Sequence, residues 1–153
     1  MDFNELLDRF TSSVEQADFE GFGELFTEDA VYWDGFYGPF EGRVAIEEMV
    51  REHFHGSGTG YKWVMEEPVF SEPLGYARYI FSYDSTIPDF EGIHVVFEGM
   101  SQFTLRDGRI ACYREVFDRG VPLTQLGYAP ERIGKSLKRW TNEMLATDRA
   151  KSM

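Results

Sequence analysis

The chain has 153 residues, 42% hydrophobic and 16% aromatic, which is enough for one domain with a substantial core. Its 27 acidic residues against 15 basic ones give a net charge of −12, which excludes the basic footprint that nucleic acids and anionic membrane surfaces require. The single cysteine excludes an internal disulfide, and with no signal-like start or membrane-spanning apolar stretch the expected location is the cytoplasm.

The first 54 residues carry helical patterns interrupted by one short strand. Apolar residues at helical spacing predict a helix over 3–17. Asp18 is the expected N-cap of a second, shorter helix over 19–26. A strand at 29–34 and a turn at 38–43 then precede a third helix over 44–54.

From Tyr61 onward the pattern becomes strand-like. Four strands are predicted, over 61–70, 75–85, 93–106 and 109–117. Asp107-Gly108 predicts a tight hairpin between the last two strands, because such a turn needs positive φ. Pro130 begins a last helix over about 130–147, whose apolar residues share one face.

This order predicts an α+β fold of one domain, residues 1–153. A cone-shaped, curved antiparallel sheet would pack against three N-terminal helices, with a C-terminal helix added and an internal cavity enclosed. Both faces of the strand "YARYIFSY" are apolar, whereas a lone antiparallel sheet usually keeps one wet face. We therefore expect a homodimer through the sheet, although tyrosines on a strand also reflect ordinary β-propensity.

The stretch "YWDGFYGPF" places one acid, Asp34, among five aromatic residues. One interpretation is an Asp that forms a turn before Gly35, with its side chain outward. The other is a carboxyl group that faces an apolar cavity, where loss of hydration raises its pKa and suits it to act as a general base.

The segments "LFTEDAVYWDGFYGPFEGRVAI" and "LRDGRIACYREVFDRGVPLTQLG", with the strands between them, resemble the nuclear-transport-factor-2-like superfamily. The nearest likeness is to its SnoaL-like branch, which contains polyketide cyclases and has relatives among ketosteroid isomerases and limonene-epoxide hydrolases. The resemblance implies the cone fold over roughly residues 3–127 and leaves the activity open, since this fold carries enzymes, binding proteins and scaffolds.

The isomerase pattern matches this chain in part. The resemblance puts Asp34 at the position of the catalytic base. Phe10 stands where the isomerase has its oxyanion tyrosine, and Gly99 or Met100 stands where it has a protonated aspartic acid. By this resemblance, the chain has the catalytic base of the isomerase and lacks its known oxyanion hole.

The epoxide-hydrolase pattern also matches in part. Tyr32 and Arg78 agree with it, and Glu115 stands in the place of its basic acid. Asp34 replaces an asparagine, and Ile80 replaces the aspartic acid that should follow the arginine.

Strand alternation predicts that these residues converge, because side chains two apart share a face. Asp34, Glu115, Tyr32 and Arg78 are the expected catalytic group, with Arg78 compensating one carboxylate. The expected substrate contacts are Trp33, Tyr37, Trp63, Met100, Tyr113, Phe117 and His53. No metal is expected, because His53 and His55 lie two apart on a helix and no acid or cysteine pattern completes a site.

The sequence thus predicts an enzyme that needs no cofactor and uses acid/base chemistry on a small, hydrophobic, ring-containing molecule. Isomerisation, cyclisation, dehydration and water addition all fit the two acids. The alternative is a non-catalytic binding or carrier protein with the same cavity, and a third interpretation is an interaction module of a larger complex.

Overall fold

Six strands form one curved sheet in the order β2-β1-β6-β5-β4-β3 in the computed structural model, which describes residues 1–153. The strands are β1 (Phe26–Asp34), β2 (Gly38–Glu41), β3 (Gly58–Ser71), β4 (Leu74–Ser85), β5 (His94–Arg106) and β6 (Arg109–Phe117). The last four form the predicted antiparallel meander. β1 pairs in parallel with β6 and antiparallel with β2, so the sheet is mixed and open.

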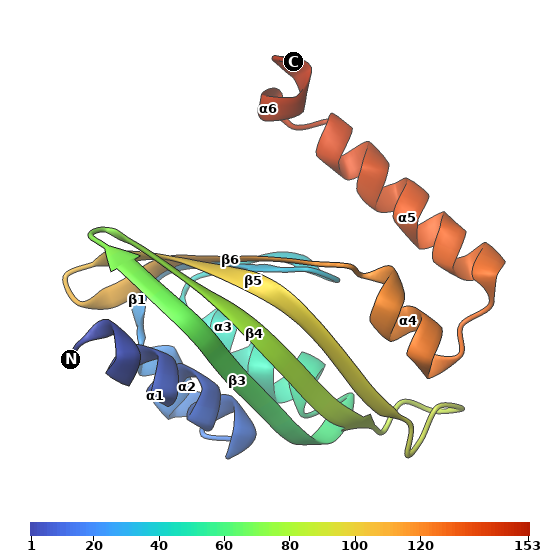
Figure 1. The fold of residues 1–153 in the computed structure, drawn as a ribbon, viewed down its shortest axis with the longest axis horizontal. Helices are drawn as coiled ribbons and strands as arrows, with labels where there is room; N and C mark the ends of the chain where they lie inside the picture. Colours follow the sequence, from blue (N-terminus) through green and yellow to red (C-terminus); the bar gives the residue numbers. More distant parts are fainter.

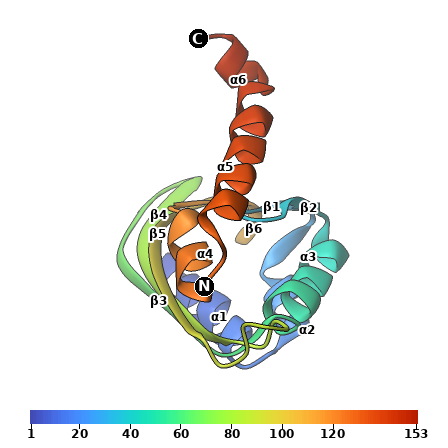
Figure 2. The same ribbon diagram turned by 90° about the vertical axis from the view of Figure 1, so that its right-hand side faces the viewer.

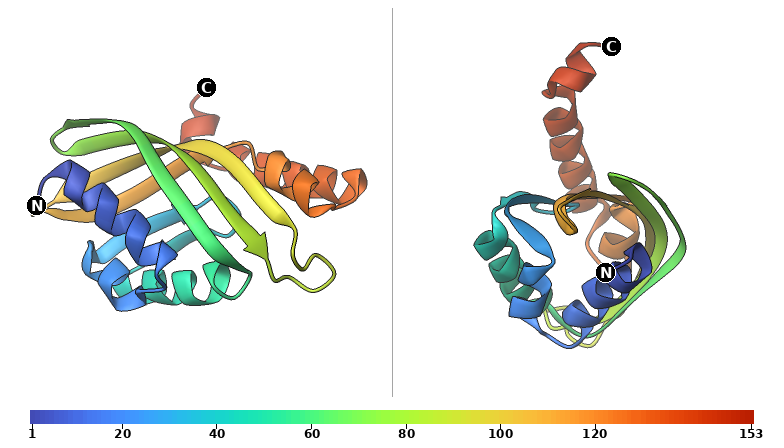
Figure 3. Two further views of the ribbon diagram at one scale, coloured as in Figure 1. Left: turned by 60° about the horizontal axis from the view of Figure 1, so that its bottom comes forward. Right: turned by 90° about the vertical axis from the view of Figure 1, so that its left-hand side faces the viewer.

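Helices cover the concave face of this sheet. The helical elements are α1 (Phe3–Glu15), α2 (Phe19–Glu24), α3 (Arg43–Met49), the π-helical turn η1 (Val50–Phe54), α4 (Gly120–Leu126), α5 (Pro130–Leu145) and α6 (Asp148–Lys151). Figures 1 and 3 show α1, α2 and α3 on one side of the sheet, which bends around them. The predicted α+β architecture is confirmed. None of the helices combines the length and the apolar character that crossing a bilayer requires.

Several local predictions are confirmed by the backbone. The Asp18 side chain accepts a hydrogen bond from the Gly21 amide and so caps α2. Asp107 and Gly108 both have positive φ, 53° and 76°, as the tight hairpin between β5 and β6 requires. Pro130 occupies the first turn of α5.

Three short elements differ from the sequence predictions. Residues 38–41, predicted as part of a turn, form β2 and pair with β1. α4 lies in a segment whose apolar pattern spans too few turns to be distinguished from a loop, and its end at Gly127 has a left-handed φ of 96°. α6 follows α5 after a short break, with the Thr147 side chain as its N-cap.

The core between α1 and the sheet is built from aromatic rings. Phe10 has no exposed surface, and its ring lies 5.0–6.3 Å between centroids from five others. These neighbours are Phe22, Phe26, Trp63, Phe103 and Tyr113. The residue that the isomerase resemblance aligned with an oxyanion tyrosine is therefore a core residue here.

We expect Phe10→Ala to lower the free energy of unfolding by about 3–5 kcal/mol, because truncating a buried phenylalanine leaves a cavity among neighbours that cannot close it. Urea unfolding followed by far-UV circular dichroism measures the change. Val44→Ala, at a position 69% exposed on α3, is the control, and it should change stability by less than about 0.5 kcal/mol. A loss of under about 1 kcal/mol for Phe10→Ala would show that the ring is not a core element.

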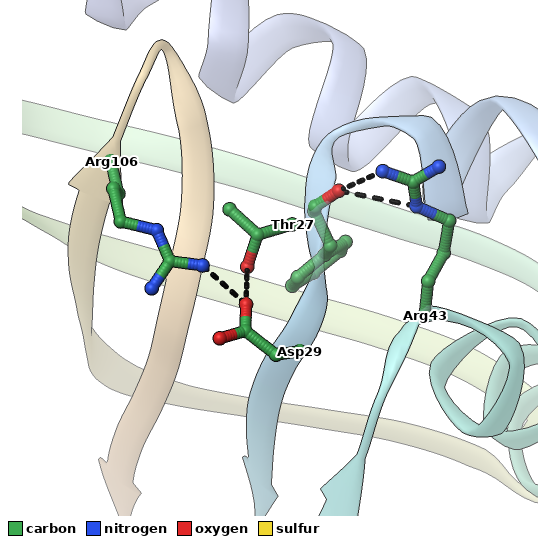
Figure 4. A network of polar contacts seen from close by, with 5 residues as sticks. Thr27, Asp29, Arg43 and Arg106 are labelled. Carbon is green, nitrogen blue, oxygen red and sulfur yellow. Dashed lines mark hydrogen bonds and ion pairs between the residues drawn. The ribbon is translucent and has the colours of Figure 1, made fainter.

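A polar network ties β1 to its neighbours at the edge away from the cavity (Figure 4). Asp29 accepts a hydrogen bond from the Thr27 hydroxyl at 2.9 Å and forms an ion pair with Arg106 of β5. The Arg43 guanidinium donates twice to the Phe26 carbonyl, at 2.7 and 3.2 Å. Hydrogen bonding to Arg106 lowers the pKa of Asp29, so this acid stays ionised beside the end of β5.

Candidate active site

A cavity of about 450 Å³ opens between the concave face of the sheet, the α3–η1 segment and the α4–α5 segment. That volume is typical of small-molecule sites. Aromatic side chains dominate its wall: Phe36, Tyr37, Phe54, Tyr61, Trp63, Tyr79, Phe81, Tyr83, Phe97, Phe117, Tyr128 and Trp140. Two acids, Asp34 and Glu115, also line it. The site is thus an aromatic chamber with two carboxyl groups.

Asp34 ends β1, where it forms the turn that one interpretation expected and faces the cavity as the other did. Its Oδ2 accepts hydrogen bonds from the backbone amides of Phe36 at 2.8 Å and Tyr37 at 3.0 Å, so it does form a turn. The same carboxyl group lines the cavity. Burial raises the pKa of Asp34, while the two amides and the charges of His53 and Arg119 oppose that rise. Hydrogen bonds from fixed amides favour the ionised form of this acid.

Glu115 lies on β6 and is surrounded by tyrosines. Its Oε2 accepts hydrogen bonds from the hydroxyls of Tyr79 and Tyr113, each at 3.1 Å. The Tyr113 hydroxyl also lies 2.8 Å from Oγ of the buried Ser101. Burial raises the pKa of Glu115 to about 8, the negative charge of Asp34 adds to the rise, and the tyrosine hydrogen bonds offset part of it.

The two acids differ in what surrounds their carboxyl groups. Glu115 carries a proton below a pKa of about 8, while Asp34 receives the backbone hydrogen bonds that stabilise a carboxylate. Because each charge acts on the other group, the pair titrates as a unit. Two acids in one cavity can act as general base and general acid when one is ionised and the other neutral.

The raised pKa of Glu115 makes stability depend on pH. An acid with a higher pKa in the folded protein binds more protons when folded, so stability falls as pH rises between the unfolded and folded values. For Glu115 this window runs from the ordinary pKa of 4.5 to about 8. Glu115→Gln removes this titration, so its stability relative to wild type should increase from pH 5 to pH 9, at about 1.4 kcal/mol per unit of pKa difference.

Thermal unfolding of both proteins at pH 5 and pH 9 measures this gain. Asp8→Asn, at an exposed position on α1, is the control and should shift the melting temperature equally at the two pH values. An equal shift for Glu115→Gln at both pH values would mean that Glu115 is ionised in the folded protein.

Strand alternation brings Tyr113, Glu115 and Phe117 to the concave face together, as predicted. Glu115 and Phe117 line the cavity, and Tyr113 lies fully buried beneath Glu115. Tyr32 is also fully buried and stacks on Tyr113 with 4.5 Å between ring centroids, so it supports the floor of the cavity and does not line it. Its hydroxyl has no hydrogen-bond partner.

Three more of the expected contacts line the cavity: Tyr37, His53 and Trp63. The His53 and Tyr37 rings stack with 4.2 Å between centroids, while Nε2 of His55 lies 2.7 Å from the Val14 carbonyl. The two histidines therefore have different surroundings.

The prediction that Arg78 points into the cavity is wrong. Tyr79, the next residue along β4, is only 2% exposed and faces inward, so Arg78 faces outward. Its guanidinium pairs with Glu66 at 3.5 Å and Glu67 at 3.4 Å on the convex face. Arg78 therefore has no contact with the carboxyl pair.

The predictions that Met100 and Trp33 contact the substrate are wrong for the same reason, because both side chains face outward. Met100 pairs with Arg78 across β4 and β5 and is exposed on the convex face. Trp33 follows the buried Tyr32 on β1, so it also faces outward, beneath the Arg114 guanidinium. Neither side chain lines the cavity.

The structure adds residues that the sequence interpretation missed. Tyr79 contacts Glu115, and the clue was present in "YARYIFSY", where the face with Tyr79, Phe81 and Tyr83 is wholly aromatic. Arg132 and Trp140 of α5 also line the cavity. The apolar face predicted for this helix fits a cover for the cavity as well as an interface, and the sequence does not decide between them.

Comparison with known structures places the fold. A hypothetical protein from Catenulispora acidiphila with a ketosteroid isomerase-like fold, in complex with trimethylamine, is 13% identical with a TM-score of 0.73 over 83% of this chain and 95% of that one. An LEH-like epoxide hydrolase from M. tuberculosis is 16% identical with a TM-score of 0.66 over 80% and 86%. IdmH, a putative polyketide cyclase from Streptomyces antibioticus, is 19% identical with a TM-score of 0.66 over 82% and 98%.

No curated protein matches the chain at a significant level. The SnoaL-like domain model, by contrast, matches residues 7–113. The matched region includes β1 with Asp34 and most of the meander, and it ends two residues before Glu115. Because the match covers more than half of the 153 residues, the chain belongs to the SnoaL-like domain family.

Proposed function

We propose that this protein is a cofactor-independent acid/base enzyme that moves a proton on an apolar, ring-containing carbonyl compound, in an isomerisation or a cyclisation. The observation that carries the proposal is the pair of carboxyl groups in one aromatic cavity, where burial raises the pKa of Glu115 to about 8 and two backbone amides donate hydrogen bonds to Asp34. The family and the isomerase-like and cyclase-like neighbours support the same class of reaction.

The reaction begins with Asp34 as the base. Its carboxylate takes a proton from the carbon next to the carbonyl group, so that a C–H bond breaks and an O–H bond forms on Asp34. The electron pair of that bond becomes the carbon–carbon double bond of an enol. Glu115 donates its proton to the carbonyl oxygen as negative charge develops there.

The second half-reaction restores both acids. In an isomerisation, Asp34 returns its proton to a different carbon, and Glu115 recovers its own when the carbonyl group reforms. In a cyclisation, the enol carbon attacks a second carbonyl carbon of the same molecule, Asp34 gives its proton to the oxygen of that carbonyl group, and Glu115 recovers its own proton as the first carbonyl group reforms. A carboxylic acid kept neutral by an apolar site is known to serve as a hydrogen-bond donor of this kind in ketosteroid isomerase.

The position of Tyr79 suits it to hold Glu115 in place. Its hydroxyl donates to the same oxygen, Oε2, that accepts from Tyr113. With Oε2 satisfied by two donors, the proton of the neutral acid belongs on Oε1. Tyr79 is therefore a positioning residue in this proposal.

Water addition to an epoxide has less support. The epoxide-hydrolase mechanism that the resemblance implies needs an arginine beside the acids. Arg78, which matched it in sequence, pairs with Glu66 and Glu67 outside the cavity. The arginines that do line the cavity, Arg132 and Arg139, come from α5 and not from the strand position that the resemblance matched.

Deuterium exchange tests the proposal without knowledge of the natural substrate. The probe is 2-tetralone, a ring-containing ketone, in D2O, and proton NMR follows the loss of the signals next to its carbonyl group. We expect the protein to accelerate this exchange over buffer. Binding of the neutral cavity probe N-phenyl-1-naphthylamine, measured by fluorescence, without any acceleration of exchange would identify a carrier protein and contradict the proposal.

A further inference from the structure

Two arginines of α5 stand at the mouth of the cavity. Arg132 and Arg139 both line it, with Ser136 between them at helical spacing on the same face of the helix. Both arginines are exposed to solvent, so they belong to the outer part of the cavity wall. Figure 2 views the molecule from this end, where α4 lies between the curved sheet and α3 and where α5 begins. The cavity therefore combines two acids with two basic residues on its α5 side.

The basic residues of α5 are divided between two faces of the helix. The helix carries Arg132, Lys135, Lys138 and Arg139, and only the two arginines line the cavity. The residue type matters, because a guanidinium presents a planar fork of N–H donors that matches the two oxygens of a carboxylate. A lysine ammonium lacks that geometry. The face of α5 that meets the cavity is thus the one suited to bind an anion.

Aromatic rings hold these arginines in place. The central carbon of the Arg132 guanidinium lies 4.6 Å from the centroid of the Tyr128 ring, and that of Arg139 lies 5.7 Å from a ring centroid of Trp140. Tyr128 and Trp140 themselves line the cavity. A guanidinium that stacks through its face keeps the N–H groups at its edge free to donate. The stacking therefore positions both side chains without using their donors.

The chain itself neutralises little of this positive charge. Arg132 forms no ion pair, and Arg139 pairs only with Glu143 of the same helix, at 3.8 Å. An exposed pair of this kind contributes little free energy, so an incoming anion can compete for Arg139. Both guanidinium groups are available to a ligand.

The charge at the mouth is also separate from the charges that act on the two acids. Burial raises the pKa of Asp34, and the cations that oppose this rise are His53 and Arg119. Neither Arg132 nor Arg139 is among the groups that shift the pKa of Asp34 or of the second acid. In a chain of net charge −12, two uncommitted arginines at one rim are complementary to an anionic group on the molecule that enters.

We propose that the ring-containing carbonyl substrate also carries a carboxylate, which Arg132 and Arg139 bind at the mouth while its carbonyl end reaches the two acids. This inference rests on the proposed function, because it adds a second contact for the ligand of the same cavity. A carboxylate fits better than a phosphate, since its single negative charge is repelled less by a body of net charge −12. The arginines also set the direction of entry, because the anionic end avoids the acids of the interior.

Displacement of N-phenyl-1-naphthylamine by a matched pair of tetralones tests this inference. 2-Tetralone-6-carboxylate bears the anion, and its methyl ester has nearly the same shape without the charge. We expect the wild-type protein to bind the carboxylate at least about fivefold more tightly than the ester. Addition of about 0.5 M NaCl should remove most of that preference, because the arginines are exposed to solvent.

Substitutions on α5 assign the preference to its two arginines. Arg132→Gln and Arg139→Gln should each weaken binding of the carboxylate at least about fivefold and change binding of the ester less than about twofold. Lys135→Gln and Lys138→Gln are the matched controls, because each removes the same charge from the same helix at a position that does not line the cavity. Both controls should keep the wild-type preference. Far-UV circular dichroism checks that every variant is folded.

Two results would overturn the contact with a carboxylate. One is equal affinity of the wild-type protein for the two tetralones. The other is a loss in the lysine controls as large as that in the arginine variants, which would indicate a general attraction of anions to α5. The phosphate ester of 6-hydroxy-2-tetralone distinguishes the kind of anion. If it binds more tightly than the carboxylate, the mouth recognises a phosphate and the choice of a carboxylate is wrong.

These binding measurements do not depend on catalysis. If the protein prefers the carboxylate but accelerates deuterium exchange on neither tetralone, the contact is correct and the proposed reaction is wrong. If it accelerates exchange on both and prefers neither, the reaction is correct and the contact is wrong. When both are correct, the arginine variants should raise the half-saturating concentration of the carboxylate and keep its saturating exchange rate within about twofold of wild type.

Discussion

Asp34→Asn should slow deuterium exchange on 2-tetralone by about 10²–10⁴-fold, the range that a positioned general base contributes. The amide has nearly the shape of the carboxyl group, and its oxygen can still accept hydrogen bonds from the Phe36 and Tyr37 amides. It cannot take up a proton at neutral pH. The fold and the cavity should therefore be kept while the base is lost.

Two further measurements make this result specific. Asp34→Asn should bind N-phenyl-1-naphthylamine with the affinity of wild type, and Asp8→Asn, at an exposed position on α1, should exchange at the wild-type rate. Full exchange activity in Asp34→Asn would remove Asp34 from the mechanism and leave its role in the turn as its only one.

Glu115→Gln should slow exchange by about 10²–10³-fold, comparable to the loss of one donor from an oxyanion hole. The amide group still fills the space beneath the substrate, but it cannot transfer a proton to the carbonyl oxygen. The wild-type rate should fall as pH rises through about 8, because Glu115 then ionises and no longer donates.

The pH profile separates catalysis from mere structural support. The descending limb near pH 8 should be missing from the residual rate of Glu115→Gln, which has no proton to lose there. If the descending limb persists unchanged in Glu115→Gln, a group other than Glu115 titrates near pH 8. The variant should also be more stable than wild type at high pH, so reduced activity would not reflect unfolding.

Opposite effects on activity and stability are expected at such a site. Glu115 is buried among rings, where an ionised acid is costly, and a nearby charge on Asp34 increases that cost. A chain selected only for stability would have a neutral residue at this position. This destabilising burial of an acid is consistent with a functional role for the pair.

Some of the site followed from the sequence because it depends on local rules. Alternation along one strand placed Tyr113, Glu115 and Phe117 together, and the cluster of rings around Asp34 indicated a desolvated acid. The hairpin at Asp107-Gly108 followed from backbone conformation alone. These inferences needed no knowledge of which elements meet in space.

The wrong predictions came from the choice of which face of a strand points into the cavity. β4 is apolar on both sides, so alternation could not decide whether Arg78 or Tyr79 points inward, and the resemblance to an epoxide hydrolase favoured the wrong one. In the structure, the wholly aromatic face turns inward, where it buries more apolar surface. Met100, which the isomerase resemblance placed at the site, pairs with Arg78 across β4 and β5 and faces outward with it.

The sequence could not predict that α4 and α5 line the cavity, because their positions depend on tertiary structure. Gly127 ends α4 with a left-handed conformation, and the chain then turns so that α5 passes the mouth of the cavity. Nothing within the α5 sequence distinguishes a face that lines a cavity from one that packs on a core or on a partner. Only the arrangement of the elements settles that question.

The central claim is that Glu115 is a neutral acid beside an ionised Asp34 at neutral pH. NMR titration of the protein labelled with ¹³C at its side-chain carboxyl groups measures this directly, with Asp34→Asn and Glu115→Gln used to assign the two signals. The account predicts that the Glu115 signal titrates near pH 8, while the Asp34 signal already shows an ionised carboxylate at pH 7. If both signals instead titrate below pH 5, no proton donor faces the cavity at neutral pH and the proposed mechanism is wrong.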